Sequence, residues 1–370
     1  MTKFAITGMG LVTPLGTGKD INWRRLIQGQ SQVRYEIQNG AFTARSDDFN
    51  AIPEPARQLS MAFFAANEAV REAGLKDSGY EPARISVAAG ESKPNLFNRS
   101  FYMESSLPQA LKKLLNARGR GTSASAACAT GALNVISGCK MIESGECDAV
   151  ICGSAETSIH PLYINSFKNM GVLSKKGYKP FDKERDGFAI GEGAGFLIIE
   201  DMKKAVFRGA NIYCEIAGFS NGFLTDNILS ISSCLSMKKL IKDAVKGETP
   251  DFIHLHGTGT KLNDYYESEA VSKSFENSDK ISLCSTKAAT GHLLGVSGVA
   301  GAVFSILAMK NGIIPPTINF TETDIPFGLD YTPNESKKRN VFSALSLSFG
   351  FGGQGAALYF KKPWGSSIYG

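Results

Sequence analysis

The sequence predicts an α/β protein whose strands and helices are stacked in layers. Short β-rich apolar runs alternate with helical stretches along the 370 residues, and this alternation is typical of layered α/β folds. There is also an internal echo, because a strand-like run followed by a Gly- and Ala-rich helix occurs before residue 145 and again before residue 312. Two similar βα units indicate two related halves, although the echo alone is too weak to establish them.

The expected elements follow one another in a regular order. Strands are expected at residues 3–10, 85–90, 148–156, 195–200, 251–257, 281–286, 341–353 and 357–360. Helices are expected near residues 60–73, 129–145, 237–246, 265–275 and 296–312. Because Gly and Ala at helical spacing let helices approach closely, we expect the helices at 129–145 and 296–312 to be buried centrally, against each other or against a sheet.

Composition and charge argue against several classes of protein. The net charge is only +5, and neither a Lys/Arg block nor an interleaved aromatic pattern predicts nucleic-acid binding, which leaves an acidic partner open. The start is interpreted as a strand and a Gly turn rather than a signal peptide, and no run of apolar residues predicts a membrane span. Seven cysteines at irregular spacing, without a CxxC pair, indicate a reduced, cytoplasmic protein with no zinc site.

Cys128 stands in the small-residue run GTSASAACATGALNV, just before an expected helix. A helix N-terminus lowers the pKa of a thiol, and small neighbours would leave room for a substrate carbonyl. The alternative is a buried structural cysteine, which is the commoner situation and the one expected for the other six cysteines. Cys128 is therefore a nucleophile only if bases and an oxyanion site lie elsewhere in the chain.

Three of the four histidines lie in short Gly- and Thr-rich segments. His254 and His256 end a strand-like run, and only His256, which stands beside a Gly turn, is expected in a cleft. Lys287 and His292 share the segment STKAATGH. Each histidine alone is as well explained by a satisfied core or turn position, as we expect for His160. The HxH spacing has no third ligand nearby, so no metal site is expected.

Six segments in order resemble the β-ketoacyl-(acyl carrier protein) synthases of the thiolase superfamily. They are AITGMGLVTPLG, SASAACATGA, PFDKERDGFAIGEGAG, HGTGTKLNDYYE, STKAATGHLLGVSG and SFGFGGQGA. Each string alone is weak, but their order is specific and the resemblance runs nearly end to end. It implies a thiolase-like α-β-α-β-α fold with a half at 1–205 that carries the nucleophile and a half at 206–370 that carries both histidines.

The resemblance also implies roles for single residues. Cys128 would be the acylated nucleophile, His256 and His292 the two active-site histidines, and Lys287 the lysine beside them. Two histidines point to the elongating Cys-His-His branch, since the initiating branch has Asn in place of the second histidine and thiolases use a second cysteine. The backbone N–H groups of Cys128 and the gating residue Phe351 would form the oxyanion hole. The implied substrate-binding residues are Thr258, Thr260, Phe167, Phe188 and Phe349, with the two threonines on the phosphopantetheine arm.

The implied reaction needs no metal or redox cofactor, because phosphopantetheine arrives on the acyl carrier protein. An acyl group moves to Cys128, malonyl-carrier loses CO2, and the carbanion attacks the acyl thioester. Neutral imidazoles of His256 and His292 can stabilise the enolate, and a nearby cation such as Lys287 would disfavour imidazolium.

Several segments depart from the family pattern. The stretch 91–120 is short and lacks the usual Gly-rich part, TDNILSIS at 225–232 lacks a usual His, Gly301 stands where a Glu is usual, and GFGGTN becomes GFGGQG. We therefore favour a specialised type II pathway, for a polyene, a polyketide or an unusual fatty acid, over bulk fatty-acid elongation. A non-catalytic chain-length factor and an acyl transferase or thioesterase stay as rivals, and a nucleotide-binding protein is disfavoured because GxGxxG is missing.

Two kinds of partner are expected. An acidic carrier protein would dock on basic residues near the tunnel mouth, although each residue alone could equally be a solvated charge. The candidates are Arg57, Lys112, Lys113, Lys168, Lys203, Lys204 and Arg208. An obligate homodimer, or a heterodimer with a related subunit, would bury apolar residues of the short segment, namely Leu96, Phe97, Phe101, Tyr102 and Met103.

Overall fold

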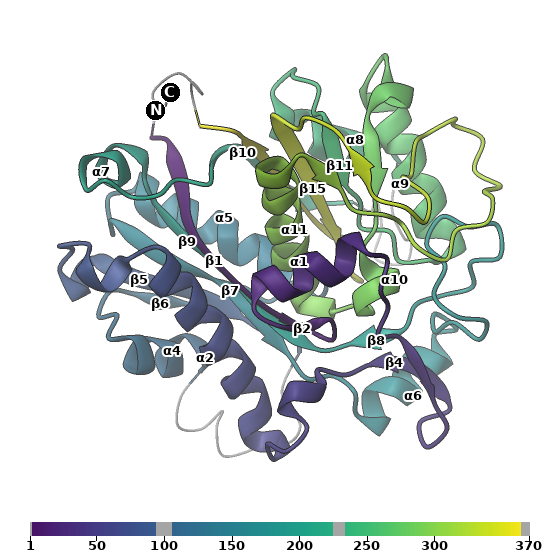
Figure 1. Ribbon diagram of the computed structural model, residues 1–370, viewed down its shortest axis with the longest axis horizontal. Coiled ribbons are helices and arrows are strands. Elements are labelled where there is room, and N and C mark those ends of the chain that lie inside the picture. The colour runs from purple at the N-terminus through teal and green to yellow at the C-terminus, as the bar shows by residue number, and fades with distance from the viewer. Residues whose placement is uncertain (1, 94–105, 225–233, 364–370) are drawn as a thin grey trace.

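A computed structural model describes residues 2–93, 106–224 and 234–363 (Figure 1). Its main sheet contains two copies of one five-stranded pattern, in the order β6-β5-β7-β9-β1 and then β12-β11-β15-β16-β10. In the first copy β5 is parallel to β6 and β7, and β9 is antiparallel to β7 and β1. In the second copy β11 is parallel to β12 and β15, and β16 is antiparallel to β15 and β10. The repeated pairing confirms that the fold has two related halves.

The strands of the first copy are β1 (Phe4–Thr13), β5 (Ile85–Gly90), β6 (Gly121–Thr122), β7 (Ala149–Glu156) and β9 (Gly193–Asp201). Those of the second are β10 (Cys214–Phe223), β11 (Phe252–His254), β12 (Ser282–Cys284), β15 (Ser343–Phe349) and β16 (Gln354–Lys361). The copies join where Phe4–Ile6 of β1 pairs antiparallel with Cys214–Ile216 of β10. Short strands outside these copies are β2 (Gly16–Thr17), β3 (Arg34–Glu36), β4 (Ala41–Ala44), β8 (Ile190–Gly191), β13 (Ile313–Ile314) and β14 (Lys337–Lys338).

Helices form three layers around the two strand patterns, as the thiolase-like fold requires. One outer layer is α2 (Glu54–Glu72) and α4 (Leu107–Leu115), which pack on β1, β5, β7 and β9. The other is α8 (Cys234–Val245), packed on β10 and β16, with α9 (Lys261–Ser274) against it. The central layer is α5 (Thr130–Glu143) and α11 (Ser297–Asn311), which contact each other and strands of both halves (Figure 1). The strands between these layers are buried on both faces, which explains their continuous apolar runs.

The remaining helices connect these layers. They are α1 (Lys19–Ile27), α6 (Pro161–Asn169), α7 (Met202–Phe207) and α10 (Lys287–Thr290). Helix α7 links β9 to β10 and spans the expected boundary at residue 205, so the exact division of the chain stays a prediction. Each of the eight expected strands and five expected helices overlaps an observed one. Strand β10 was not expected, because CEIAGFSNGF mixes apolar residues with Gly, Ser and Asn.

Glycines let the two central helices meet at their first turns. A Cβ on Gly131 of α5 would lie 2.9 Å from the carbonyl oxygen of Gly295 and 3.0 Å from the nitrogen of Val299. A Cβ on Gly298 of α11 would lie 2.7 Å from the nitrogen of Ala132. The contact is therefore made by main chain, as the Gly- and Ala-rich sequence predicted.

One described stretch, Leu294–Asn311, is long and apolar enough to cross a bilayer by length and composition. However, 89% of it is buried inside the protein, where it forms the central helix α11. Its apolar character is therefore explained by packing within the fold.

Candidate active site

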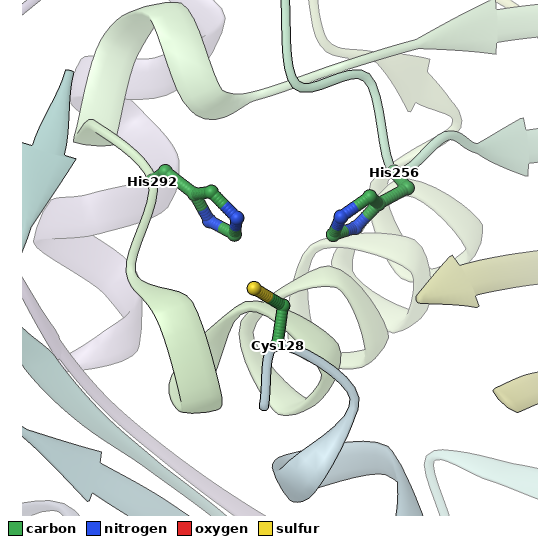
Figure 2. A group of neighbouring side chains, drawn as sticks. All are labelled: Cys128, His256 and His292. Atoms are coloured by element: carbon green, nitrogen blue, oxygen red, sulfur yellow. The ribbon is translucent and has the colours of Figure 1, made fainter. Parts of the chain in front are cut away.

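Three side chains that are far apart in the sequence meet between the two halves (Figure 2). Cys128 lies just before α5, His256 just after β11, and His292 in the turn between α10 and α11. The Cys128 sulfur and one nitrogen of each imidazole all lie within 4.8 Å of one another. Three possible ligand atoms this close together could also bind a soft metal ion. The expected absence of a metal site therefore stays a prediction.

The loop before α5 holds Cys128 in a sharp turn. Ala127 has a positive φ of 46°, a conformation that L-residues rarely adopt. The turn is held by the first helical turn, because Thr130 Oγ1 donates to the Ala127 carbonyl at 2.7 Å and accepts from the Ala126 N–H at 2.9 Å. The backbone N–H of Phe351, in the loop between β15 and β16, acts to lower the pKa of the Cys128 thiol. This expected oxyanion donor therefore lies close to the Cys128 sulfur.

Burial dominates the electrostatics of the thiol. The side chain of Cys128 is buried, and loss of water raises the pKa of its thiol to about 11, although Lys93 and Lys287 each act to lower it. The favourable end of α5 and the two cations therefore do not outweigh desolvation in the closed site. The raised pKa means that the Cys128 thiol is neutral at rest, so a proton must leave it before the sulfur can react as a thiolate.

Both site histidines are neutral. Burial lowers the pKa of His256 and of His292 well below the usual imidazole value, and the positive charge of Lys287 lowers both further. Nδ1 of His292 accepts from the Leu294 N–H at 3.2 Å and contacts Ser297 Oγ at 2.9 Å. Because Nδ1 is an acceptor, the proton is assigned to Nε2, which is buried without a partner among the described residues. His292 therefore offers a hydrogen-bond donor toward the cavity.

Two buried carboxylates on α9 hold the loop that carries His256. Glu267 accepts from the N–H of His256 at 2.6 Å and of Gly257 at 2.8 Å, while Asp264 accepts from the N–H of Gly259 at 3.1 Å. Burial raises the pKa of both carboxyl groups. The segment HGTGTKLNDYYE contains these residues, but from sequence we interpreted only its histidine and threonines. Their signal was the acidic i, i+3 pair on the helix that follows the glycines.

Lys287 lies at the start of α10, fully buried. Its Nζ donates to the carbonyl oxygen of His256, and burial lowers its pKa. The lysine thus holds the His256 carbonyl group, whereas Glu267 holds the His256 N–H, and its positive charge adds to the effect of burial in keeping both imidazoles neutral.

A cavity of about 360 Å3 leads to these residues. Its wall contains Cys128, His256 and His292, the expected gating residue Phe351, and three of the expected substrate residues, namely Thr258, Thr260 and Phe349. The hydroxyls of Thr258 and Thr260 are 2.9 Å apart. Phe167 and Phe188 stand behind the wall: their ring centroids are 6.2 and 6.4 Å from that of Phe351. The outer end of the cavity is formed by Met170, Gly171, Lys261 and Leu262.

Two family models match this chain. The model described as "Beta-ketoacyl synthase, N-terminal domain" matches residues 46–205, and the one described as "Beta-ketoacyl synthase, C-terminal domain" matches residues 209–321. The chain belongs to the β-ketoacyl synthase family. The resemblance stated from the sequence is thus confirmed, and the protein is a ketosynthase of the elongating Cys-His-His type, an enzyme of the acyltransferase class.

This β-ketoacyl synthase is similar to curated proteins over almost its whole length. It is 30% identical to 3-oxoacyl-(acyl-carrier-protein) synthase 2 of Vibrio harveyi, over 97% of this chain and 98% of that protein. Among solved structures it resembles a type II polyketide synthase acyl-carrier protein in complex with its ketosynthase, with TM-score 0.89, 27% identity and coverage of 98% and 99%. It also resembles the ishigamide ketosynthase/chain length factor, with TM-score 0.88, 27% identity and the same coverage.

The prediction that Arg57 and Arg208 of the synthase dock the carrier protein is wrong. Arg57 is only 4% exposed, and its guanidinium pairs with the buried carboxylate of Glu192. Arg208 is largely buried against Glu200 and the carbonyl oxygen of Ala73. The sequence shows the charge of an arginine but not the buried carboxylate that binds it. For Arg57 that carboxylate, Glu192, is far away in the chain. The three candidates on α7, including Arg208 at its end, also lie far from α6 and α9 and from the cavity mouth (Figure 1).

The structure explains one departure from the family pattern. A Cβ on Gly301 would lie 2.8 Å from Nδ1 of His254, so His254 fills the space that a side chain would need. His254 points away from the cavity, as predicted, and its Nε2 contacts Thr286 Oγ1 at 3.0 Å. Residues 225–232 and the apolar residues expected at a dimer interface lie outside the described residues.

Proposed function

We propose that this synthase catalyses decarboxylative Claisen condensation. It would hold an acyl chain as a thioester on Cys128 and join it to malonyl-acyl carrier protein, giving 3-oxoacyl-acyl carrier protein and CO2. The observation that carries the proposal is the convergence of one thiol and two neutral imidazoles at the end of a single cavity. The names of its relatives, 3-oxoacyl-(acyl-carrier-protein) synthases, support the carrier-bound substrate.

The first half-reaction transfers the acyl group. The sulfur of Cys128 attacks the carbonyl carbon of the carrier thioester, and the tetrahedral oxyanion is held by the N–H groups of Cys128 and Phe351. The carrier thiolate then leaves and takes up the thiol proton. The acyl group stays on Cys128 as a new thioester. Phe351, between Phe167, Phe188 and the cavity, is placed to move as the acyl chain enters.

The second half-reaction forms the carbon–carbon bond. The malonyl carboxylate leaves as CO2, and its electron pair passes into the thioester enolate, whose oxygen accepts hydrogen bonds from His256 and from Nε2–H of His292. The enolate carbon attacks the acyl thioester, and the Cys128 thiolate leaves and takes up a proton from solvent, which restores the thiol. Neutral histidines serve this step because they donate a hydrogen bond without giving up a proton to the carbanion. Phosphopantetheine arrives on the carrier, and the proposed steps use no metal or redox group.

The proposed pathway rests on the segments that depart from the family pattern, and not on the residues at the end of the cavity. The shortened stretch 91–120 and the replacements at Gly301 and Gln354 lead us to favour a specialised polyene, polyketide or unusual fatty-acid pathway in the cytoplasm. The polyketide and ishigamide neighbours agree with this choice. Bulk fatty-acid elongation is the first alternative, and a non-catalytic chain-length factor is the second.

One experiment separates a condensing enzyme from a thioesterase and from a chain-length factor. The protein is loaded with a panel of acyl carriers of different chain length, and the mass of the intact chain is measured before and after malonyl-carrier is added. We expect an acyl adduct that disappears on malonyl addition with release of CO2. An adduct that hydrolyses without malonyl would indicate a thioesterase, and no adduct with any carrier would indicate a chain-length factor.

The carrier is expected to dock on the basic rim of the cavity. Lys261 belongs to the cavity wall, and Lys168 ends α6, next to the exposed Met170. Reversing one charge, Lys261→Glu, should weaken carrier binding about tenfold at low salt and remove part of its salt dependence. The measurement is carrier affinity at low and high salt. The matched control is Lys204→Glu on α7, and an equal loss for both variants would contradict this docking face.

The assembly is expected to be an obligate dimer. Strand β6 lies at the end of the strand order, so it leaves backbone groups at a sheet edge next to the nucleophile loop. A homodimer or a heterodimer with a related subunit would bury more than about 2,000 Å2 there. Light scattering measures the mass: a fully active monomer at submicromolar concentration would contradict the prediction, and activity gained only with a related subunit would select the heterodimer.

A further inference from the structure

A buried ion pair outside the predicted site contacts the turn that carries His292 and is linked through its neighbours to the loop that carries Cys128. Glu156 ends β7, its side chain is 3% exposed, and its Oε1 lies 3.2 Å from the Nζ of Lys93 in the loop after β5. The Lys93 side chain is 17% exposed, and Nζ also lies 4.8 Å from the ring centroid of Tyr163. Lys93 lies in the shortened stretch 91–120 that departs from the family pattern, and no step of the proposed reaction uses the pair.

The carboxylate of Glu156 collects donors from three segments. Its Oε2 accepts from the N–H of Ser92 at 3.1 Å, from the Ser92 hydroxyl at 2.6 Å, and from the N–H of Gly295 at 3.3 Å. Its Oε1 accepts from the Ser158 hydroxyl at 2.5 Å. On the other side of Ser92, the hydroxyl of Ser125 donates to the Glu91 carbonyl at 3.2 Å, which links this cluster to the nucleophile loop.

The contact with Gly295 falls in a strained turn. Leu294 has a positive φ of 48°, and its N–H is the donor that holds Nδ1 of His292 as an acceptor. A bulky residue adopts this conformation only when its surroundings enforce it. The hydrogen bond from the next residue to Glu156 is such a restraint, so the orientation of His292 depends on the carboxylate.

A lone carboxylate here would oppose the chemistry. Glu156 acts to raise the pKa of the Cys128 thiol, whereas Lys93 acts to lower it and ranks as the larger influence of the two. The other charged or titratable groups toward the thiol are Lys287 on α10, the neutral His256 and His292, Tyr178 before β8, and Asp186 and Lys261 in the cavity wall. Lys93 thus offsets a negative charge that the turn requires.

We propose that Lys93 and Glu156 form a positioning pair: Glu156 holds the turn that carries His292, and Lys93 balances its charge beside Cys128. Neither residue touches the reacting atoms. The pair therefore acts through the histidine and the thiol. Removing one charge or the other should shift the pH profile of Cys128 alkylation in opposite directions.

The test is the pH profile of alkylation of Cys128 by iodoacetamide, followed by mass spectrometry of its peptide. Lys93→Met leaves the carboxylate unbalanced, so the profile moves to higher pH and alkylation at about pH 8 slows at least threefold, the effect of half a pKa unit. Glu156→Gln leaves the lysine unbalanced, so the profile moves to lower pH. The double variant returns toward wild type, and Lys93→Arg, which keeps the charge, stays near it. Lys287 is common to all variants, so their differences report the pair.

Matched controls use a second partly buried pair, Lys19 and Glu72, whose charged atoms are 2.8 Å apart on α1 and α2. Lys19→Met and Glu72→Gln should lower the melting temperature without moving the alkylation profile. The proposal is overturned if both single variants at the new pair shift the profile in the same direction, or no more than the controls. If Glu156→Gln does not fold, the comparison of Lys93→Met with Lys93→Arg decides alone.

A second measurement rests on the proposed function. Glu156→Gln should slow malonyl decarboxylation about tenfold while acylation of Cys128 persists. If the wild-type protein itself releases no CO2, the proposed function fails. If wild type is active and the variant decarboxylates at the same rate, only the positioning role fails.

Discussion

Replacing Cys128 by Ala is expected to abolish both acylation and condensation, by at least about a thousandfold. No other described side chain offers a thiol to the cavity that contains both imidazoles. Ala also fits the turn before α5, because it is smaller than Cys and its neighbours are small. The protein should therefore fold, and the loss should be chemical. Intact mass after incubation with acyl carriers measures the acyl adduct, and CO2 release measures condensation.

Cys234→Ala is the matched control. Cys234 is the one cysteine that is only partly buried, so it is the best competitor for non-specific labelling, and it lies at the start of α8. This control should acylate like wild type. An acyl mass shift that persists in Cys128→Ala would show that another residue is the nucleophile.

Changing His256 or His292 to Ala is expected to separate the two half-reactions. Acylation of Cys128 should stay largely intact, whereas decarboxylative condensation should slow by at least about a hundredfold, the scale of losing a donor to a forming oxyanion. Lys287→Ala should impair the same step, because the lysine holds the His256 carbonyl and disfavours both imidazolium forms. Rates of acylation and of CO2 release, measured on the same preparation, give the separation.

The structure sharpens this prediction for His292. Since Nδ1 is an acceptor and Nε2 carries the proton, His292→Gln should retain more activity than His292→Ala by keeping a donor. The pKa of both histidines is lowered, so they stay neutral as the pH falls through the usual imidazole value, and condensation should not decline there on their account. His160→Ala, at the N-cap of α6, is the control. Wild-type condensation by both alanine variants would refute the mechanism.

The reactive residues could be predicted because their signals are local. Cys128 precedes a Gly- and Ala-rich helix, His256 ends an apolar run beside a glycine, and Lys287 and His292 share one short segment. Periodicity in the same way indicated the central helices and the buried strands. The order of six such segments then fixed how they come together, which no single segment could do.

The supporting residues could not be predicted because their partners are far away in the chain. Arg57 was expected on the surface, but Glu192 binds it in the interior. Glu156 accepts hydrogen bonds from the N–H groups of Gly295 and Ser92. The apolar run DAVICGSAE, which contains Glu156, predicts neither of these contacts. Strand β10 was missed because its glycines and polar residues break the apolar pattern, although pairing on both sides holds it in the sheet.

The glycine contact between α5 and α11 determines how far apart Cys128 and His292 are held. Main-chain atoms approach closely at Gly131 and Gly298. The distance between the starts of the two helices therefore does not depend on the size of a side chain between them. Cys128 and His292 stand just outside those starts. Substitutions that change core volume elsewhere can shift sheets and outer helices without changing this spacing. We therefore expect the distance between Cys128 and His292 to respond less to changes of core volume elsewhere than a spacing set by packed side chains would.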